Sequence, residues 1–445
     1  MKKGIIFLFS ALMICAAVGV FVGCADSSSY EPDGQTQKRE QFKEKLSHEV
    51  TQVEAREHLE KFLTKLNIPS TRGGDTKLPP ITSVYTTGKA AEMTRAGEEV
   101  EPYFHIFNFG DNEGFAIMSG DDRVEPLLAL TFQGELTPET EIENPGFEIA
   151  YSRMEDYYIE RIGIADTIPS IQPDLPIPPR DTIPLIIPVR DTTIYSTEYF
   201  DLPTGPCPVE WGQTIPYYKF CFVPGTYNHA CTGCAAVALA QLMSIYKHPS
   251  SYTGYIYHWD EMNLYTCKYI TNPYVSDVSK SDQIAHLMRH LGLSENLDMA
   301  YGEDVSYANV DRVLPTLLNF GYTNGRKISY DTTDVTDELK NGYPVLIYGY
   351  DGYNNGHMWL GHGEMERTRT YIGYNEFDEV VLTNTVIDKY ILCNWGWDGN
   401  DNGYFLSGVF DASEDSIYPL EDITRSEDYK NFEYNLNAFI NIRKQ

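Results

Sequence analysis

Basic residues are scarce in this chain. It has 34 Lys and Arg against 64 Asp and Glu in 445 residues, which gives a formal net charge of −30. Because this charge would repel a polyanion and no basic cluster offsets it, the composition argues against nucleic acid or anionic lipid as a partner. The rest of the composition is that of a globular protein, since 42% of the residues are hydrophobic and 33 are tyrosines.

Long apolar runs are also missing, except at the very start. The stretch MKKGIIFLFSALMICAAVGVFVGC has a charged head and an apolar centre, so residues 1–24 are predicted to be an export signal. Its end resembles a lipobox, which would make Cys24 a lipidated first residue; a plain secretory signal is the alternative. The polar residues 25–49 predict a flexible tether. We therefore expect an outer-membrane or cell-surface lipoprotein, or a secreted protein, whose one link to a membrane is a lipid on Cys24.

Cysteine is rare in the first 200 residues of the chain, where Cys15 and Cys24 belong to the predicted signal. The others follow residue 200 and are Cys207, Cys221, Cys231, Cys234, Cys267 and Cys393. In an oxidising compartment such cysteines ordinarily form disulfides. If one of them is a catalytic thiol, an odd number is left to pair.

Two helical patterns enclose a β-like pattern in the N-terminal part. Residues 50–68 and 146–162 have apolar residues at helical spacing. Residues 102–132 alternate apolar and polar side chains around the turn signals GDNEG and GDD, which indicates a small antiparallel sheet. Together they predict one compact α+β domain over residues 50–165.

Proline recurs in the next segment, DTIPSIQPDLPIPPRDTIPLIIPVRDTT. Such a sequence favours extended polyproline conformations, so residues 166–200 are predicted to be an exposed linker in which proteolytic processing occurs.

The remaining residues, 201–445, are expected to form a second domain in which helices precede strands. Helices are predicted at 234–247, 281–292 and 308–321, and strands at 344–350, 357–363, 369–374, 390–395, 403–408 and 437–442. That order indicates an α+β fold, with a helical subdomain packed against an antiparallel sheet and a cleft between them.

The first of these helices carries a candidate nucleophile. The segment CAAVALAQLMSIY is apolar almost all round, so it is expected to be a buried helix with Cys234 in its first turn. Free N–H groups and the helix dipole would stabilise a thiolate there, which predicts a lowered pKa for Cys234. A buried structural cysteine fits the same position.

A thiol nucleophile needs a base, a group that orients the base, and donors for an oxyanion. His357 in NGHMWLG is a candidate base, and Asn394 in LCNWGWDGNDNGYF has an amide oxygen that could accept from its imidazole N–H. Trp395 and Trp397 could shield that bond from water. Gln213 in VEWGQTIPYY offers a neutral amide donor. Each residue alone has an ordinary structural explanation, whereas their occurrence together indicates a thiol-dependent active site.

The order Gln213, Cys234, His357, Asn394, with TGCAAVALAQLMSIYKHP, GHMWLGHG and NWGWDGNDNGYF, closely resembles the streptopain family of bacterial cysteine proteases, which have a papain-like fold. The segments LDMAYG and ELKNGYPVLIYGY agree with it, and YFHIFNFGDNEGFAIMSGDDRVEPLLALT resembles the family's propeptide. The resemblance covers most of the chain from about residue 50.

The resemblance implies a zymogen of a cysteine endopeptidase that acts on proteins or peptides without a cofactor or metal. Cys234 would be the nucleophile, His357 the general acid and base, and Asn394 the residue that orients His357. Gln213 would donate to the oxyanion together with the backbone N–H of Cys234, and Trp395 would support the pair. The propeptide, residues 50–165, would inhibit the enzyme in cis until it is cut away.

Two departures from the family pattern keep other readings open. A second histidine, His362, lies near the first, in the sequence Gly361-His362-Gly363. We expect His362 to have a structural or specificity role. Cys231 makes a Cys-x-x-Cys motif with Cys234, which is typical of dithiol redox sites. That alternative needs a strand directly before the motif, and PGTYNHA supplies none.

Three further alternatives follow from the same residues. A zinc site of Cys231 and Cys234 with His229 or His248 would need a second pair at matching spacing. A catalytically inactive lipoprotein would not need all four catalytic residue types. A disulfide between Cys231 and Cys234 could keep an enzyme inactive until it is reduced.

Overall fold

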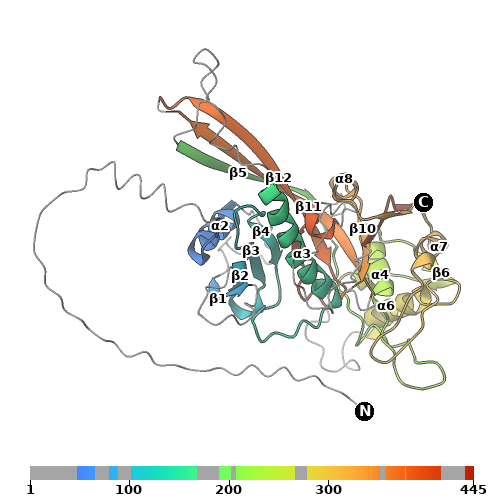
Figure 1. Cartoon of the computed structure of the whole chain (residues 1–445). Coiled ribbons are helices and arrows are strands. Elements are labelled where there is room, and N and C mark those ends of the chain that lie inside the picture. Colours follow the sequence, from blue (N-terminus) through green and yellow to red (C-terminus); the bar gives the residue numbers. More distant parts are fainter. Residues whose placement is uncertain are drawn as a thin grey trace, which may run out of the picture. The chain divides into compact units, whose positions relative to one another are not determined.

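The computed structural model describes residues 48–65, 80–88, 102–167, 190–201, 207–265, 278–350, 356–375, 377–411 and 436–445 (Figure 1). The predicted export signal with Cys24, nearly all of the predicted tether, the prolines of residues 168–189 and Cys267 lie outside these residues. Within the described ranges, no helix has the length and apolar character needed to cross a membrane.

The described residues before and after the proline-rich segment are named here the N-terminal lobe (48–167) and the C-terminal lobe (190–445). The N-terminal lobe contains α2 (Gln52–Lys65), β1 (Ile81–Gly88), β2 (Pro102–Phe109), β3 (Phe115–Ser119), β4 (Leu127–Thr131) and α3 (Pro145–Thr167). The helices of the C-terminal lobe are α4 (Cys234–Tyr246), α5 (Trp259–Met262), α6 (Val278–Leu291), α7 (Val313–Asn319) and α8 (Thr332–Lys340). Its main strands are β5 (Arg190–Asp201), β9 (Arg326–Ser329), β10 (Val345–Tyr350), β11 (Gly356–Tyr374), β12 (Val380–Asn394), β13 (Gly403–Leu406) and β14 (Asn437–Ile440). Two short ribbons pair β6 (Ser251–Tyr252) with β7 (Tyr255–Ile256) and β8 (Tyr322–Thr323) with β15 (Arg443–Lys444).

The mixture of helices and antiparallel strands confirms the predicted fold class. The main sheet has 11 strands in the order β1-β2-β3-β4-β13-β12-β11-β10-β14-β9, with β5 added beside β11. The sequence predicts a small sheet confined to the N-terminal lobe, but the structure joins the two lobes in one sheet. Residues Ala129, Leu130 and Thr131 of β4 pair with Phe405, Tyr404 and Gly403 of β13.

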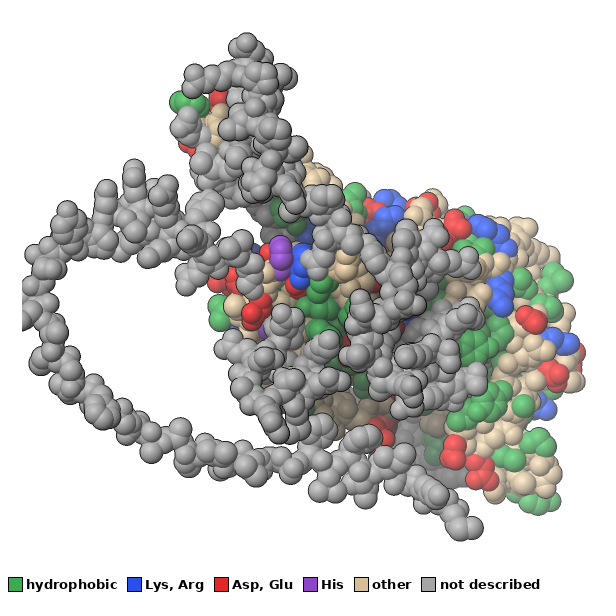
Figure 2. All heavy atoms as spheres, in the orientation of Figure 1, with side chains coloured by type: hydrophobic (Ala, Val, Ile, Leu, Met, Phe, Trp, Pro, Cys, Tyr) green, Lys and Arg blue, Asp and Glu red, His purple; other side chains and the backbone are tan. Residues whose placement is uncertain are grey.

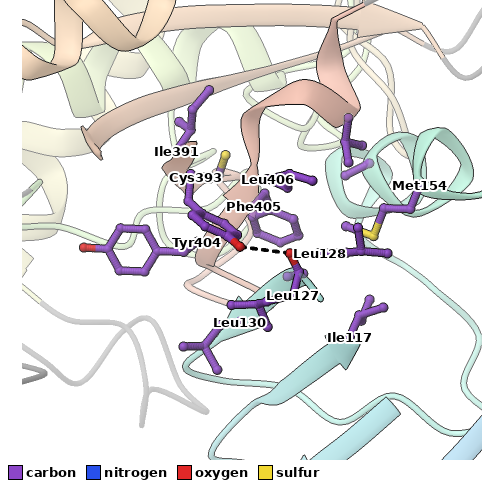
Figure 3. Packing of buried hydrophobic residues seen from close by; sticks show 14 of the residues in the cluster. Ile117, Leu127, Leu128, Leu130, Met154, Ile391, Cys393, Tyr404, Phe405 and Leu406 are labelled. Carbon is purple, nitrogen blue, oxygen red and sulfur yellow. Dashed lines mark hydrogen bonds between the residues drawn. The ribbon is translucent and has the colours of Figure 1, made fainter. Parts of the chain in front are cut away.

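Apolar packing reinforces this junction. Leu127, Leu130 and Ile117 of the N-terminal lobe belong to the same buried cluster as Phe405 and Leu406 of the C-terminal lobe (Figure 3). The dashed line in Figure 3 marks the hydrogen bond from the hydroxyl of Tyr390 to the carbonyl oxygen of Leu127, at 3.1 Å. The edge of the C-terminal sheet is thus covered by a strand and its side chains, which removes an exposed β edge.

Part of the predicted linker is a strand instead. Residues Arg190–Asp201 form β5, which pairs antiparallel with β11 from Tyr374 back to Gly363. The first residues of β11 pair with β10 on the same edge, from Gly356 to Gly361. β11 is therefore long enough to hold both strands end to end, and residues 190–200 of the predicted linker belong to the C-terminal sheet.

Two hydrophobic cores lie on opposite sides of β11. Met358 and Leu360 face a core built around α4, whose residues from Ala235 to Ile245 are all buried. Trp359 faces the other core, which combines β2–β4 and α3 with Trp395 and Phe405. Because neighbouring strand residues point to opposite faces, the start of β11 connects α4 with the N-terminal lobe.

The surface carries charges of both signs. On the face shown in Figure 2, Lys and Arg side chains of the described residues lie among Asp, Glu and hydrophobic side chains. The described part of this face has no basic patch for a polyanion.

The pairing of β4 with β13 predicts the effect of a methyl group at Gly403. A Cβ there would overlap the carbonyl oxygen of Leu130. We expect Gly403→Ala to lower the free energy of unfolding by about 2 kcal/mol or more and to speed amide hydrogen exchange in β4. Chemical denaturation and exchange mass spectrometry measure both. Unchanged exchange in β4 would contradict the pairing.

Candidate active site

Cys234 begins α4, and the residue before it is suited to that position. Gly233 has a φ of 86°, where a side chain is strained, and a Cβ there would overlap the methyl group of Met299. No side chain caps this helix end, so first-turn N–H groups remain available to the thiol. Burial nevertheless outweighs these donors and raises the pKa of Cys234. The predicted lowering of the pKa is therefore wrong for this state, and the thiol is neutral.

Cys234, Gln213 and His357 line one cavity of about 870 Å³. Met358, Tyr348, Tyr350 and Trp397 line it from the C-terminal lobe, and Pro145 and Glu148 of α3 line it from the N-terminal lobe. The backbone N–H of Thr232 donates to the carbonyl oxygen of Gln213 at 3.0 Å. This bond ties the chain at Gln213 to the residues just before Cys234.

His357 is buried, with 1% of its side chain exposed. Its Nε2 lies 2.8 Å from the carbonyl oxygen of Trp395. A carbonyl oxygen only accepts, so Nε2 carries the proton and Nδ1 has a free lone pair. Burial lowers the pKa of His357 to about 4, although the Trp395 carbonyl acts in the opposite direction. Within the described residues, no hydrogen bond joins His357 to Cys234, and both groups are neutral.

Asn394 has partners other than His357. Its Nδ2 donates to the carbonyl oxygen of Val209 at 2.8 Å, and its Oδ1 accepts from Gln241 Nε2 at 2.9 Å and from the Gly396 N–H at 3.2 Å. The structure thus gives the position facing the imidazole to a backbone carbonyl, which the sequence analysis missed because a backbone atom has no residue-type signal.

Trp395 is held on every side. Its backbone N–H donates to Asn402 Oδ1 at 3.0 Å, and its indole N–H donates to the Asp401 carbonyl at 2.9 Å. Its ring packs edge-on against Phe405, with centroids 4.9 Å apart. The carbonyl that meets His357 therefore has a fixed place.

The first turn of α3 lies directly on this pair. A Cβ at Gly146 would be 2.5 Å from Cε3 of Trp395 and 2.7 Å from Cδ2 of His357. Only glycine lets the helix approach so closely. The N-terminal lobe therefore covers the imidazole, and the sequence analysis did not single out Gly146.

Asn144 fastens this turn to the C-terminal lobe. Its Oδ1 accepts from the N–H groups of Gly146 and Phe147, as an N-cap does. Its Nδ2 donates to the Asn400 carbonyl at 3.1 Å and to Asp401 Oδ2 at 3.2 Å. Burial raises the pKa of Asp401 to about 6.

The two departures in sequence have structural explanations. The sulfur of Cys231 donates to the carbonyl oxygens of Glu303 and Asp304, at 3.2 and 3.4 Å. His362 is buried, and its Nδ1 accepts from the backbone N–H of Cys207 at 3.0 Å. Cys231 thus anchors a loop whose Asp304 lines the cavity, and His362 anchors the chain at Cys207.

No disulfide joins the described cysteines, which are Cys207, Cys221, Cys231, Cys234 and Cys393. The predicted disulfides are thus not formed among them, and Cys231 and Cys234 are both thiols.

The described residues do not gather Cys231, Cys234, His229 and His248 into a metal-binding group. Among the described residues, the group that could hold a cation is His48, Asp121 and Asp122, none of which lines the cavity. Arg123 binds both carboxylate oxygens of Asp121, at 2.9 and 2.7 Å, which opposes a cation there.

Comparison with known proteins agrees with this arrangement. The pattern of the peptidase C10 family matches residues 211–405, and that of the Spi protease inhibitor matches residues 47–157. Streptopain of Streptococcus pyogenes is 24% identical over 367 residues, which cover 73% of this chain and 79% of streptopain. The thiol protease/hemagglutinin PrtT of Porphyromonas gingivalis is 23% identical over 356 residues, which cover 74% of this chain and 36% of PrtT.

This chain thus spans only about a third of the length of PrtT. Among solved structures, a prointerpain A fragment from Prevotella intermedia is 19% identical with a TM-score of 0.48, covering 79% of this chain and 98% of that one. The two matched patterns fall on the two lobes, with the inhibitor pattern on the lobe that covers His357. The chain therefore contains a peptidase C10 domain, of the kind found in cysteine proteases such as streptopain, behind a Spi-type inhibitor domain, and this is the organisation of a zymogen.

Proposed function

We propose that the peptidase domain hydrolyses peptide bonds in proteins and peptides, with Cys234 as the nucleophile and His357 as the general acid and base. The observation that carries this proposal is the cavity in which Cys234, His357 and Gln213 meet. Its donors and titratable groups are of the types that acyl transfer by a thiol requires.

The proton transfers follow from the tautomer of His357. With Nε2–H bound to the Trp395 carbonyl, Nδ1 takes the thiol proton of Cys234 once the covering turn has moved away. The thiolate then attacks the scissile carbonyl carbon and forms a C–S bond. The N–H of Cys234 and the side chain of Gln213 donate to the resulting oxyanion.

Breakdown of this intermediate completes the reaction. The C–N bond breaks as the imidazolium gives its proton to the leaving amine, which leaves a thioester on Cys234. His357 next takes a proton from water, the hydroxide attacks the thioester, and the acid product leaves as the thiol recovers its proton. In this scheme the Trp395 carbonyl orients His357, and Asn394 acts behind it rather than on the ring.

Latency has a steric and an electrostatic part in this proposal. Gly146 occupies the space beside His357, and Pro145 and Glu148 narrow the cavity that substrate must enter. The same contact removes water from His357 and Cys234, so both stay neutral and the thiolate–imidazolium pair does not form.

Activation requires a cut between the lobes. The predicted processing region, residues 166–200, runs from the end of α3 into β5, and we place the cut in the proline-rich sequence between these two elements. We propose that β5 stays with the peptidase domain after the cut, since it pairs with β11. Because the sequence predicts an export signal, we also propose that the enzyme acts outside the cytoplasm. Lipidation of Cys24 stays a prediction.

The thiol role is tested by a matched pair of cysteine variants. The unprocessed chain, from residue 25 onward, is incubated with reductant, and its size and its cleavage of casein are followed over time. We expect Cys234→Ala to stay full length and inert, and Cys231→Ala to shorten and cleave like the parent. A redox role would make the two variants equally defective, and processing by Cys234→Ala would contradict the proposal.

The contact of α3 with His357 is tested by two identical substitutions in one helix. Gly146→Ala puts a methyl group against His357 and Trp395, whereas a methyl group at Gly163 meets nothing within 4 Å. Both changes favour the helix by up to about 1 kcal/mol. We expect faster self-processing, by about threefold or more, in Gly146→Ala only. Equal rates for both variants would rule out the contact as a cause of latency.

The buried carboxyl of Asp401 predicts a pH dependence of latency. Its pKa of about 6 under α3 lies above the usual value, so the neutral acid favours docking and ionisation opposes it. This contribution to docking is complete at low pH and is lost as the pH rises through about 6. Asp401→Asn stays neutral at every pH.

We therefore expect parent and Asp401→Asn to self-process at similar rates near pH 4.5. At pH 7 the parent should be faster, by about threefold or more. The ratio of the two rates is measured, because it cancels the pH dependence of catalysis itself. A ratio that does not change with pH would contradict the role of Asp401.

A further inference from the structure

Gln241 is a polar residue inside a helix that is otherwise nearly apolar. It lies in α4 about two turns after Cys234, on nearly the same side of the helix. Its side chain is 0% exposed, and its Oε1 has no hydrogen-bond partner within the described residues. A buried amide with an unmatched oxygen costs stability, so packing alone does not explain a glutamine here.

Its amide nitrogen joins two other segments of the chain. Nε2 donates to the carbonyl oxygen of Trp211 at 3.1 Å and to Oδ1 of Asn394 at 2.9 Å. Asn394 donates in turn to the Val209 carbonyl and accepts from the Gly396 N–H. These bonds allow one orientation of the Asn394 amide, because its oxygen must face Gln241 and its nitrogen must face Val209.

Each joined segment leads to a group of the active site. The chain runs from Trp211 to Gln213, the proposed oxyanion donor. It runs from Asn394 directly to Trp395, whose carbonyl meets Nε2 of His357. Gln241 itself shares α4 with Cys234, so one amide connects the supports of all three proposed catalytic groups.

We propose that Gln241 is a positioning residue of the peptidase reaction. Its amide holds Asn394, and through Asn394 it holds the Trp395 carbonyl where it accepts from His357. Gln241 reaches neither the substrate nor the reacting atoms. This inference rests on the proposed roles of Cys234 and His357.

Loss of the amide has consequences that a loss of stability alone would not produce. When the Trp395 carbonyl is less well placed, the imidazolium of the active enzyme loses an acceptor and gives up its proton more readily. We expect Gln241→Met to lower kcat by about tenfold with little change in KM. The alkaline limb of the pH profile of kcat/KM should move to lower pH.

The experiment compares processed enzymes. Variants are processed with a trace of tagged parent enzyme, which is then removed, and kcat and KM are measured on a quenched fluorescent peptide from a casein site that the parent cuts. Ser244→Ala is the matched control, since Ser244 is a buried polar residue of the same helix whose hydroxyl bonds to the Gln241 carbonyl rather than to Asn394. Together with the parent and Gln241→Met, the variants Asn394→Ala and Gln241→Met/Asn394→Ala form a double-mutant cycle.

This double-mutant cycle distinguishes a positioning role of Gln241, which acts on kcat through Asn394, from a role in folding stability alone. If Gln241 acts through Asn394, Gln241→Met lowers kcat in the parent and has little further effect in the Asn394→Ala background. The same tenfold loss in both backgrounds overturns the inference. So does a lowered Tm with kcat and pH profile both unchanged, as expected of Ser244→Ala.

Failure of the proposed function has a different signature. The parent then fails to cleave the peptide, or Cys234→Ala cleaves it equally fast, and that result overturns both proposals. The rate at which iodoacetamide alkylates Cys234 over the same pH range is a second measure of the protonation of His357, because the imidazolium stabilises the thiolate. Slower alkylation of Gln241→Met than of Ser244→Ala near neutral pH is the expected result, and equal rates overturn the inference.

Discussion

The hydrogen bond from Nε2 of His357 to the carbonyl oxygen of Trp395 is the interaction on which the arrangement of the site depends. It selects the tautomer in which Nδ1 has a free lone pair, and it fixes the ring at the wall of the cavity. The backbone that supplies the carbonyl is itself held by Asn402 and Asp401 from one side and by the Asn394 network from the other. The inhibitor domain packs on these same two residues, since Gly146 of α3 lies against both the imidazole of His357 and the indole of Trp395.

Burial links the geometry of the inhibitor domain to the chemistry of the peptidase. Removing water from a thiol and an imidazole disfavours the charged form of both. The pKa of Cys234 is raised and that of His357 is lowered to about 4, so their neutral forms coexist in the covered site. A single covering turn can thus favour the neutral forms of both groups without displacing either residue from the cavity. Asn144 adds a contact to Asp401, a carboxyl whose pKa burial raises to about 6.

Much of the fold is readable in the sequence, because local periodicity determines it. The apolar run after Cys234 gives α4, and alternation around GDNEG and GDD gives β2–β4 nearly as observed. The position of β5 is not readable, since its partner in β11 is remote in sequence and the prolines before it favour an extended linker. The same limit applies to the joining of β4 with β13, which places both lobes in one sheet.

In the site, too, residue types can be predicted from the sequence, whereas contacts between distant segments cannot. A cysteine at a helix start, a histidine at a strand start and a glutamine upstream are recognisable by type, and the structure brings all three to one cavity. Side-chain type does not reveal that a backbone carbonyl rather than Asn394 faces His357, or that a glycine in another lobe covers the ring. Both depend on close approach between distant segments.

The inhibitor domain covers His357, and we propose that this cover sets the ionisation of the imidazole. NMR titration of the imidazole follows this in the Cys234→Ala chain with labelled histidine, before and after a trace of parent enzyme removes the inhibitor domain. We expect a pKa of about 4 for His357 in the uncut chain and a value at least one unit higher after removal. The same pKa in both forms would contradict this proposal.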